Sequence, residues 1–290
     1  MTVQKKAYAK INLTLELLGT RRADGYHDIL SIMHKVPLFD EVTVEAKRGG
    51  SGIALTCDRD VCRPEDNLAY RAAKAYLEKY KENGGEDVGI YIDLKKNIPS
   101  KAGLAGGSSD AAAVLDALSE AIGNADDAEI EKIASDIGSD VPFCLEKHKC
   151  ALCSGRGEIT QEIKSLSGVY AVIIFPSIDM PTGSVYSEYD KTHGDDYSKN
   201  ASIKMAEKLN AGESAESVLG LMCNDFLPIC EKKCALIAEA RKELEDGGAY
   251  SQMSGSGSAV FGIFTSESEY LSFSERKKNG NNQYFYLGAI

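Results

Sequence analysis

The 290-residue sequence lacks any run of about 18 consecutive apolar residues, the length that a membrane-spanning helix requires. Its first residues lead into a strand-like pattern and not into the apolar run of a signal peptide. Positive charge is also scarce, because 33 Lys and Arg stand against 44 Asp and Glu, for a net charge of -11. Nucleic-acid binding draws mainly on clustered Lys and Arg. We therefore expect a cytoplasmic protein with no membrane or nucleic-acid partner.

The cysteines also lack the spacing of a metal site. Eight are scattered along the chain, and without a secretion signal we interpret them as reduced thiols. Cys150 and Cys153 form a CxxC pair, but a structural zinc site needs a second pair or histidines at similar spacing. We expect buried or edge thiols here, and the sequence identifies no metal ligand.

Periodicity outlines the organisation of the chain. Apolar residues alternate from Ile11 to Leu17 with Lys10, Asn12 and other polar residues between them, which predicts a half-buried strand. Asp24-Gly25 indicates a turn. The same reasoning predicts strands at 29–38, 41–44, 88–94, 169–175, 249–253, 259–264 and 283–287, and helices at 66–81, 108–122, 267–277 and from a cap at 126 or 127 to 137.

The length predicts two domains, which we place at residues 1–164 and 165–290, with a single large domain as the lesser alternative. In the second half the element order is strand, helices, strand, strand, helix, strand. That order is typical of a ferredoxin-like unit, here with extra helices in its first crossover.

One glycine-rich segment indicates chemistry. A predicted strand leads into Gly103, Gly106 and Gly107, and Ser108 and Ser109 then open a helix. Glycine lets a phosphate approach the backbone N–H groups, and a helix N-terminus adds unpaired donors and a positive dipole end. The segment is neither a Walker A loop nor a Rossmann fingerprint. We predict an anion-binding loop, with a flexible connector carrying a serine N-cap as the alternative.

The loop, Pro99-x3-Gly103-Leu104-x-Gly106-Gly107-Ser108-Ser109, resembles the phosphate loop of the GHMP kinases, which act on small molecules such as homoserine and mevalonate. Other motifs are similar to a branch of this superfamily whose substrate is a cytidine-diphospho sugar alcohol. They span nearly the whole chain: Ala9-Lys10-Ile11-Asn12-Leu13, Asp24-Gly25-Tyr26-His27, Gly138-Ser139-Asp140-Val141-Pro142, Gly155-Arg156-Gly157-Glu158, Pro181-Thr182, Asn224-Asp225-Phe226 and Ser254-Gly255-Ser256-Gly257-Ser258.

The resemblance implies an α+β, two-domain GHMP kinase architecture, with an N-terminal domain like domain 2 of ribosomal protein S5 and a ferredoxin-like C-terminal domain. It implies ATP-dependent phosphorylation, with Mg²⁺, of the 2-hydroxyl of that sugar alcohol in the non-mevalonate (MEP) isoprenoid pathway. We expect a monomer or a weak homodimer. The alternatives are another GHMP-type kinase, of the mevalonate or homoserine class, and a nucleotide-binding regulatory module without catalysis.

Phosphoryl transfer to an alcohol needs a positioned hydroxyl, an acceptor for its proton and cations against the developing charge. On the resemblance, Asp140 is the candidate base and Lys10 the catalytic cation, although an isolated Asp after a helix is more often a solvated cap. The implied substrate contacts are Asn12, Tyr26, His27, Thr182 and Tyr186, with Tyr26 and Tyr186 sandwiching cytosine, and the segment 254–258 is expected to offer N–H groups to the diphosphate. The implied ATP contacts are Asn67, Lys96, Pro99, Lys101, Ala102, Gly103, Leu104, Ala105, Gly106, Gly107, Ser108 and Ser109.

Overall fold

The computed structural model describes the whole chain except residues 20, 24, 60–61, 193–197 and 277–281, so Asp24 of the predicted turn lies outside the described residues. The chain divides into two compact units. The first comprises Met1–Ala9, Leu38–Ser100 and Ala105–His148, and the second comprises Lys10–Pro37, Lys101–Leu104 and Lys149–Ile290. The strands β1 (Thr2–Leu18) and β2 (Asp28–Arg48) contribute to both. These units have other bounds than the domains expected at 1–164 and 165–290, and that division stays a prediction.

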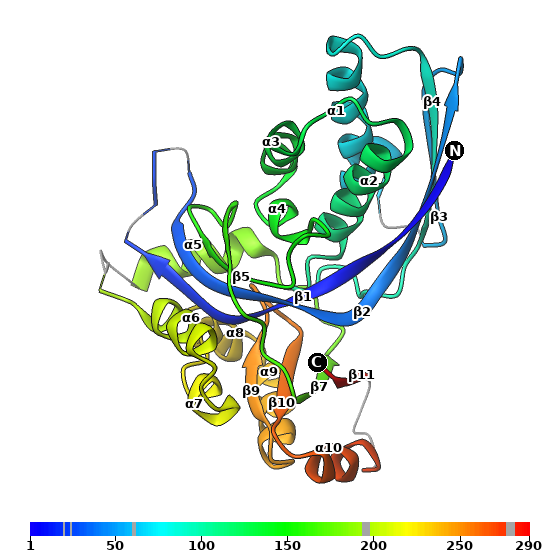
Figure 1. Cartoon of the computed structure of the whole chain (residues 1–290). Coiled ribbons are helices and arrows are strands. Elements are labelled where there is room, and N and C mark those ends of the chain that lie inside the picture. The colour runs from blue at the N-terminus through cyan, green and yellow to red at the C-terminus, as the bar shows by residue number, and fades with distance from the viewer. Residues whose placement is uncertain (20, 24, 60–61, 193–197, 277–281) are drawn as a thin grey trace. The chain divides into compact units, whose positions relative to one another are not determined.

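In the first unit, strands and a group of helices pack together (Figure 1). Strand β4 pairs antiparallel with β2 and parallel with β3, while α1 and α2 pack against each other. The elements confined to this unit are β3 (Ile53–Cys57), the short 3₁₀ turn Pro64–Asp66, α1 (Leu68–Glu82), β4 (Val88–Lys95), α2 (Gly106–Ile122), α3 (Asp127–Ile137) and α4 (Val141–Cys144).

The helix ends of this unit follow from their capping chemistry. Asp126 caps α3, with Glu129 completing a capping box, which decides between the two predicted caps. Helix α2 ends before Gly123 as predicted, but it begins at Gly106 and not at Ser108. The predicted start was wrong because glycine has a low helix propensity, which favoured a start after Gly107, whereas the tertiary structure places both glycines in the first turn.

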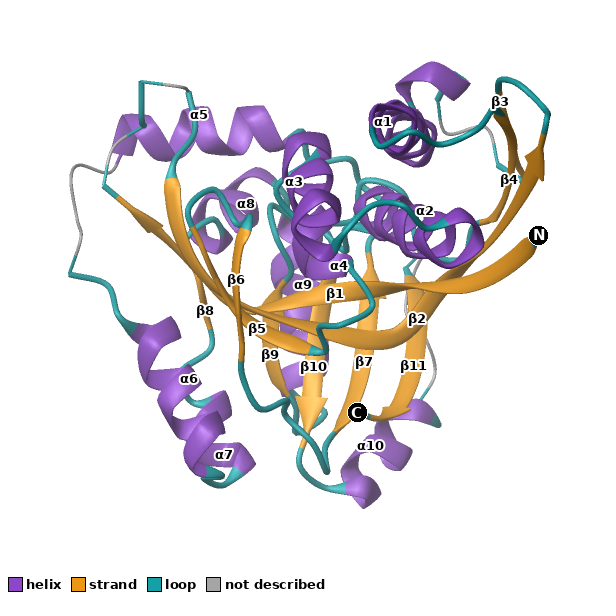
Figure 2. Ribbon diagram, turned by 45° about the horizontal axis from the view of Figure 1, so that its top comes forward, coloured by secondary structure: helices purple, strands orange, loops and turns teal. Residues whose placement is uncertain are grey.

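In the second unit, four described strands form a sheet in the order β11-β7-β10-β9, with every neighbouring pair antiparallel (Figure 2). The ferredoxin-like arrangement is confirmed, because β10 lies between β7 and β9 and β11 adds on the other side of β7. The bounds in this unit are β5 (Cys150–Ser154), β6 (Ile159–Glu162), β7 (Tyr170–Phe175), α5 (Thr182–Thr192), α6 (Ala201–Ala211), α7 (Ala215–Leu219), β8 (Cys223–Asn224), α8 (Leu227–Lys233), α9 (Ala235–Glu245), β9 (Tyr250–Met253), β10 (Val260–Phe264), α10 (Glu267–Ser274) and β11 (Gln283–Ala289).

One face of this sheet packs against α9 and α10 and forms a core with side chains from β1 and α8, and the other face is also buried. Phe226, Phe261 and Phe264 are almost fully buried. Burial of such side chains supplies the main favourable free energy of folding. Within the described chain, no helix is long and apolar enough to cross a membrane.

Strand β1 differs from its prediction. The sequence predicts a half-buried strand, but both of its faces are buried between residues 10 and 17, polar side chains included. Thr14 Oγ1 accepts from the Ile32 N–H at 2.9 Å, and Glu16 accepts from the N–H groups of Ala201 and Ser202 at 3.0 and 2.7 Å. Buried polar groups are stable only when they are hydrogen-bonded. The polar face of β1 therefore anchors the N-terminus of α6, whose N-cap residue makes no side-chain cap.

This anchor predicts the effect of Glu16→Ala. The substitution leaves the first N–H groups of α6 and the Ser202 hydroxyl without their carboxylate partner. We expect the free energy of unfolding to fall by about 3 kcal/mol, since each unsatisfied buried group costs roughly 1–3 kcal/mol. Glu207→Ala, at an exposed position of the same helix, is the control and should change it by less than about 0.5 kcal/mol. Equal losses in urea unfolding would contradict this role of Glu16.

Candidate functional site

The predicted phosphate loop joins β4 to α2 and has unusual backbone geometry. Lys101, Gly103 and Ala105 all have positive φ, at 57°, 78° and 59°. Ala105 is the N-cap residue of α2, and it lies in the left-handed region with no side-chain cap. The non-glycine residues in this region are strained, and such strain is concentrated at functional sites.

Gly103 is the tightest point of the loop. A Cβ atom there would lie 2.2 Å from the carbonyl oxygen of Ser254, closer than any real Cβ contact. The Gly103 carbonyl accepts hydrogen bonds from Ser254 Oγ at 2.9 Å and from Lys10 Nζ at 3.3 Å. Only glycine fits this position, because both the φ angle and the space exclude a side chain.

The uncapped end of α2 presents its backbone donors. The first helix bond to Ala105 is made by the Ser109 N–H at 2.9 Å. Within the described chain, the N–H groups of Gly106, Gly107 and Ser108 have no hydrogen-bond acceptor. Unpaired N–H groups and the positive end of the helix dipole together favour an anion. This geometry is what phosphate binding requires.

Lys10 and Asn12 lie together on the buried polar face of β1. Lys10 Nζ donates to Asn12 Oδ1 at 2.7 Å, and Asn12 Oδ1 also accepts from the Gly255 N–H at 2.9 Å. Asn12 Nδ2 donates to Ser31 Oγ at 2.8 Å. Lys10 is only 3% exposed and is therefore not a surface lysine. Its ammonium is held in place beside the Gly103 carbonyl.

Asp140 belongs to the first unit and is the N-cap residue of α4. Pro142 follows within the first turn of that helix, where its fixed φ suits the helix start. The Asp140 carbonyl accepts from the Cys144 N–H at 3.2 Å. Its backbone is thus fixed by α4, and its catalytic role stays a prediction.

Of the residues predicted to bind cytidine, His27 and Tyr186 contact each other, and Tyr26 contacts Arg156. The His27 ring stacks on Tyr186, with centroids 5.5 Å apart, and His27 Nε2 is bonded to Asp190 Oδ1 at 2.7 Å. Tyr26 is 49% exposed, and the Arg156 guanidinium lies 4.9 Å from its ring centre. The Tyr26–Tyr186 sandwich stays a prediction. Nothing in the local sequence pattern identified Asp190 as the partner of His27.

The segment 254–258 is already largely hydrogen-bonded within the second unit. The N–H groups of Ser254, Gly255 and Gly257 have acceptors in the protein, and Ser256 Oγ lies 2.8 Å from Thr182 Oγ1 at the start of α5. Fewer of its backbone donors remain for a diphosphate than the sequence suggested. Thr182 is near this segment, as expected of a substrate contact, and its role stays a prediction.

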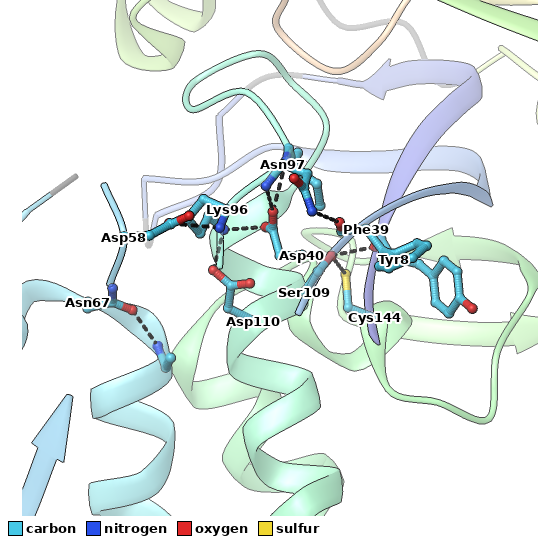
Figure 3. A network of polar contacts seen from close by, with 12 residues as sticks. Tyr8, Phe39, Asp40, Asp58, Asn67, Lys96, Asn97, Ser109, Asp110 and Cys144 are labelled. Atoms are coloured by element: carbon cyan, nitrogen blue, oxygen red, sulfur yellow. Dashed lines mark hydrogen bonds and ion pairs between the residues drawn. The ribbon is translucent and has the colours of Figure 1, made fainter. Parts of the chain in front are cut away.

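Several predicted ATP contacts also serve the fold of the first unit (Figure 3). Asn67 Oδ1 caps α1 through the Ala69 N–H at 2.9 Å, and Ser109 Oγ donates to the Tyr8 carbonyl at 2.7 Å. Pro99 is buried, while Lys101, in the second unit, is exposed and pairs with Asp179 at 2.6 Å.

Lys96 is buried and forms ion pairs with Asp40 and Asp110. Sequence reasoning missed Asp40. The sequence could have indicated it, because Asp40 alternates with Leu38 and Val42, which face inward from the same side of β2.

Metal ligation has little support in the described residues. Cys150 and Cys153 lie on β5 at positions of opposite parity, so their side chains point to opposite faces. No group of three or more His, Cys, Asp or Glu side chains among the described residues is arranged to hold a metal ion.

Comparison with known proteins identifies the family of this site. The GHMP kinases N terminal domain matches residues 67–148, which include the phosphate loop, and the GHMP kinases C terminal domain matches residues 205–274. The 4-diphosphocytidyl-2-C-methyl-D-erythritol kinase of Acetivibrio thermocellus is 39% identical over 100% of this chain and 99% of its own length. The chain is a GHMP kinase. The corresponding enzyme of Caldanaerobacter subterraneus is also 39% identical, over 91% of this kinase and 88% of the relative.

Solved structures confirm the two-domain GHMP kinase fold. A crystal structure of 4-(cytidine 5'-diphospho)-2C-methyl-D-erythritol kinase matches this kinase with a TM-score of 0.75 and 31% identity over 99% of the chain and 98% of its own. Homoserine kinase from Cytophaga hutchinsonii matches with a TM-score of 0.71, at 20% identity over 99% of this kinase and 95% of that chain, which shows the fold alone. The kinase therefore has the α+β architecture that the sequence implied, and ATP is the phosphoryl donor of its family.

The close approach at Gly103 predicts a large effect of Gly103→Ala. The alanine would be strained at a φ of 78° and would displace the Ser254 carbonyl. We expect the free energy of unfolding to fall by about 1–3 kcal/mol from the strain alone. The control is Gly183→Ala in α5, where no atom lies within 4 Å of a new Cβ; it should be neutral or stabilise by up to about 1 kcal/mol. Thermal unfolding that does not separate the two variants would contradict the close approach.

Proposed function

We propose that this kinase transfers the γ-phosphoryl group of ATP to the 2-hydroxyl of 4-diphosphocytidyl-2-C-methyl-D-erythritol, a step of the non-mevalonate (MEP) isoprenoid pathway. The observation that carries the proposal is the 39% identity to a kinase of that name over the full length of both chains. The uncapped start of α2 supports it, since a triphosphate is the anion that such an end would bind. The cytoplasmic location and the monomeric or weakly dimeric state stay predictions.

In this proposal the chain's own residues position the reactants. The ATP phosphates lie against the loop from Lys101 to Ser109, and Asn67 contacts the nucleotide. The substrate hydroxyl attacks the γ-phosphorus, the bond to the β-phosphate oxygen breaks, and ADP leaves. Asp140 accepts the hydroxyl proton, while Lys10, held by Asn12, stabilises the charge near the attacking oxygen. Tyr26, His27, Thr182 and Tyr186 form the cytidine end of the substrate site.

Mg²⁺ is the metal that we propose to accompany ATP. Mg²⁺ is commonly bound through substrate phosphates with few protein ligands, and it offsets the charge on the transferring group. The described residues offer no preformed cluster of ligands. In this proposal Mg²⁺ would be held mainly by phosphate oxygens when ATP is bound.

The assay that tests the substrate uses purified kinase with Mg-ATP and a panel of alcohols, with ADP release as the readout. The proposal expects turnover with the cytidylated sugar alcohol and competition by CDP. Turnover with mevalonate or homoserine, unaffected by CDP, would replace it by another GHMP-type activity. ATP binding without turnover of any alcohol would support the regulatory module.

The role of Asp140 predicts the effect of Asp140→Asn. Loss of positioned proton transfer should lower kcat by ~10²–10⁴ while the KM for ATP stays within a few-fold. Asp136→Asn is the matched control, because Asp136 is an exposed residue of α3 that pairs with Lys132 at 3.2 Å; its kcat should stay within about two-fold of wild type. A kcat for Asp140→Asn within a few-fold of wild type would remove the assignment.

Stacking on cytosine predicts the effect of Tyr26→Ala. Lost stacking should weaken binding of the cytidylated substrate by ~1–3 kcal/mol and leave the KM for ATP unchanged. Tyr91→Ala, at another exposed tyrosine, on β4, is the control and should alter neither KM. The measurement is steady-state kinetics with each substrate varied, and an unchanged KM for the cytidylated substrate would exclude the sandwich.

A further inference from the structure

A buried ionic group lies beneath the phosphate loop in the first unit. Lys96 Nζ donates to Asp40 Oδ2 and to Asp110 Oδ2 (Figure 3). The side chains of Lys96, Asp40 and Asp110 are only 6%, 0% and 3% exposed. The ammonium therefore has its charge compensated inside the protein, and these residues act on the loop through the backbone and α2.

Asp40 holds the entrance of the loop. Its Oδ1 atom accepts hydrogen bonds from the N–H groups of Asn97 and Ile98, at 2.5 and 2.8 Å. The Ile98 side chain in turn lies against the first residue of α2, because a Cβ on Gly106 would meet Ile98 Cγ2 at 3.1 Å. The same Cβ would lie 3.6 Å from Asp40 Oδ2. Asp40 thus binds the residues before the loop and has Oδ2 close to Gly106, the first residue after it.

Asp110 holds the exit of the loop. It lies in α2 four residues after Gly106, and its bond to Lys96 connects the helix to the end of β4. Asp40, Lys96 and Asp110, which we call the clasp, therefore join residues 96–98 to residues 106–110. The N–H groups of Gly106, Gly107 and Ser108 lie in the stretch of chain between Ile98, which Asp40 binds, and Asp110, which Lys96 binds.

We propose that the clasp residues are positioning residues for ATP: they fix the start of α2 so that its unpaired N–H groups converge on the phosphates. This inference rests on the proposed function in taking ATP as the nucleotide. Lys96 then positions α2 through its bonds to Asp40 and Asp110. This role is additional to the nucleotide contact that the family resemblance implies for Lys96. Rigid placement of donors favours binding because no ordering is needed when the ligand arrives.

The charges of the clasp separate an electrostatic effect on ATP affinity from a positioning effect. Two carboxylates share one ammonium. Burial and the neighbouring Asp40 carboxylate raise the pKa of Asp110 to about 7, although the Lys96 ammonium acts in the opposite direction. The two carboxylates outweigh burial at Lys96 and raise its pKa. Replacing Asp40 or Asp110 by asparagine lowers the negative charge near the phosphate site, which by electrostatics alone would strengthen ATP binding. Loss of positioning would weaken it, so the two effects have opposite signs.

The experiment is calorimetric titration of the full chain with Mg²⁺ and AMP-PNP, comparing Asp40→Asn and Asp110→Asn with wild type. We expect the Kd to rise at least ten-fold in each. The Kd of the double variant should be little higher than that of either single variant, because substitutions within one hydrogen-bonded cluster are not additive. The control Glu41→Gln removes a charge from the neighbouring residue of β2, which is 56% exposed and pairs with Lys95 at 3.6 Å. Its Kd should stay within two-fold.

Each outcome has a distinct meaning. A merely structural clasp would reduce the bound stoichiometry or the unfolding temperature and leave the Kd of the folded fraction unchanged, which would overturn the proposal. An unchanged or lower Kd in both single variants would also overturn it. If Asp40→Asn fails to fold, Asp110→Asn, which keeps the Asp40 bonds to Asn97 and Ile98, decides alone. Wild-type protein that binds no AMP-PNP would overturn the proposed function and the clasp together.

Discussion

The proposed phosphate site depends on one unmet hydrogen-bonding requirement, the open N-terminus of α2. Most helices satisfy their first N–H groups with a side-chain cap. Here the N-cap residue is Ala105 in the left-handed conformation, which has no side-chain oxygen to offer. Unpaired N–H groups at the positive end of a helix dipole favour the binding of an anion. The loop and its supports maintain this arrangement.

The supports come from two separate places in the sequence. In the second unit, Gly103 fits against the Ser254 carbonyl and its own carbonyl accepts from Lys10. In the first unit, Asp40 and Lys96 tie the residues before the loop to Asp110 in α2. Each support is polar and wholly or partly buried, so losing one of its hydrogen bonds is costly; Asp110 Oδ1 alone has no hydrogen-bond partner among the described residues.

The fold was largely predictable from local patterns. Alternation located β1, β2 and β4, and the order of elements after residue 168 was enough for the ferredoxin-like sheet. The two alternatives for the cap of α3 could also have been decided, because Glu129 stands at the capping-box spacing from Asp126. These features depend on residues that are close together in the chain.

What the sequence did not predict depends on residues far apart. The burial of Glu16 follows from the N–H groups of α6, 185 residues away, and no local pattern contains that contact. The pairing of Lys96 with Asp40 spans 56 residues, so no local pattern contains it either. For the site, the loop and Lys10 came from motifs, whereas Asp40 and Asp190 became visible only through their partners in three dimensions.

The central claim is that main-chain N–H groups at the start of α2 hold the triphosphate. The most direct measurement is to follow the amide signals of Gly106, Gly107 and Ser108 in ¹⁵N-labelled protein while AMP-PNP and Mg²⁺ are added. If these groups bind the triphosphate, their three signals will shift more than those elsewhere in α2, and their hydrogen exchange will slow on binding. Saturating nucleotide with all three signals and exchange rates unchanged would contradict it.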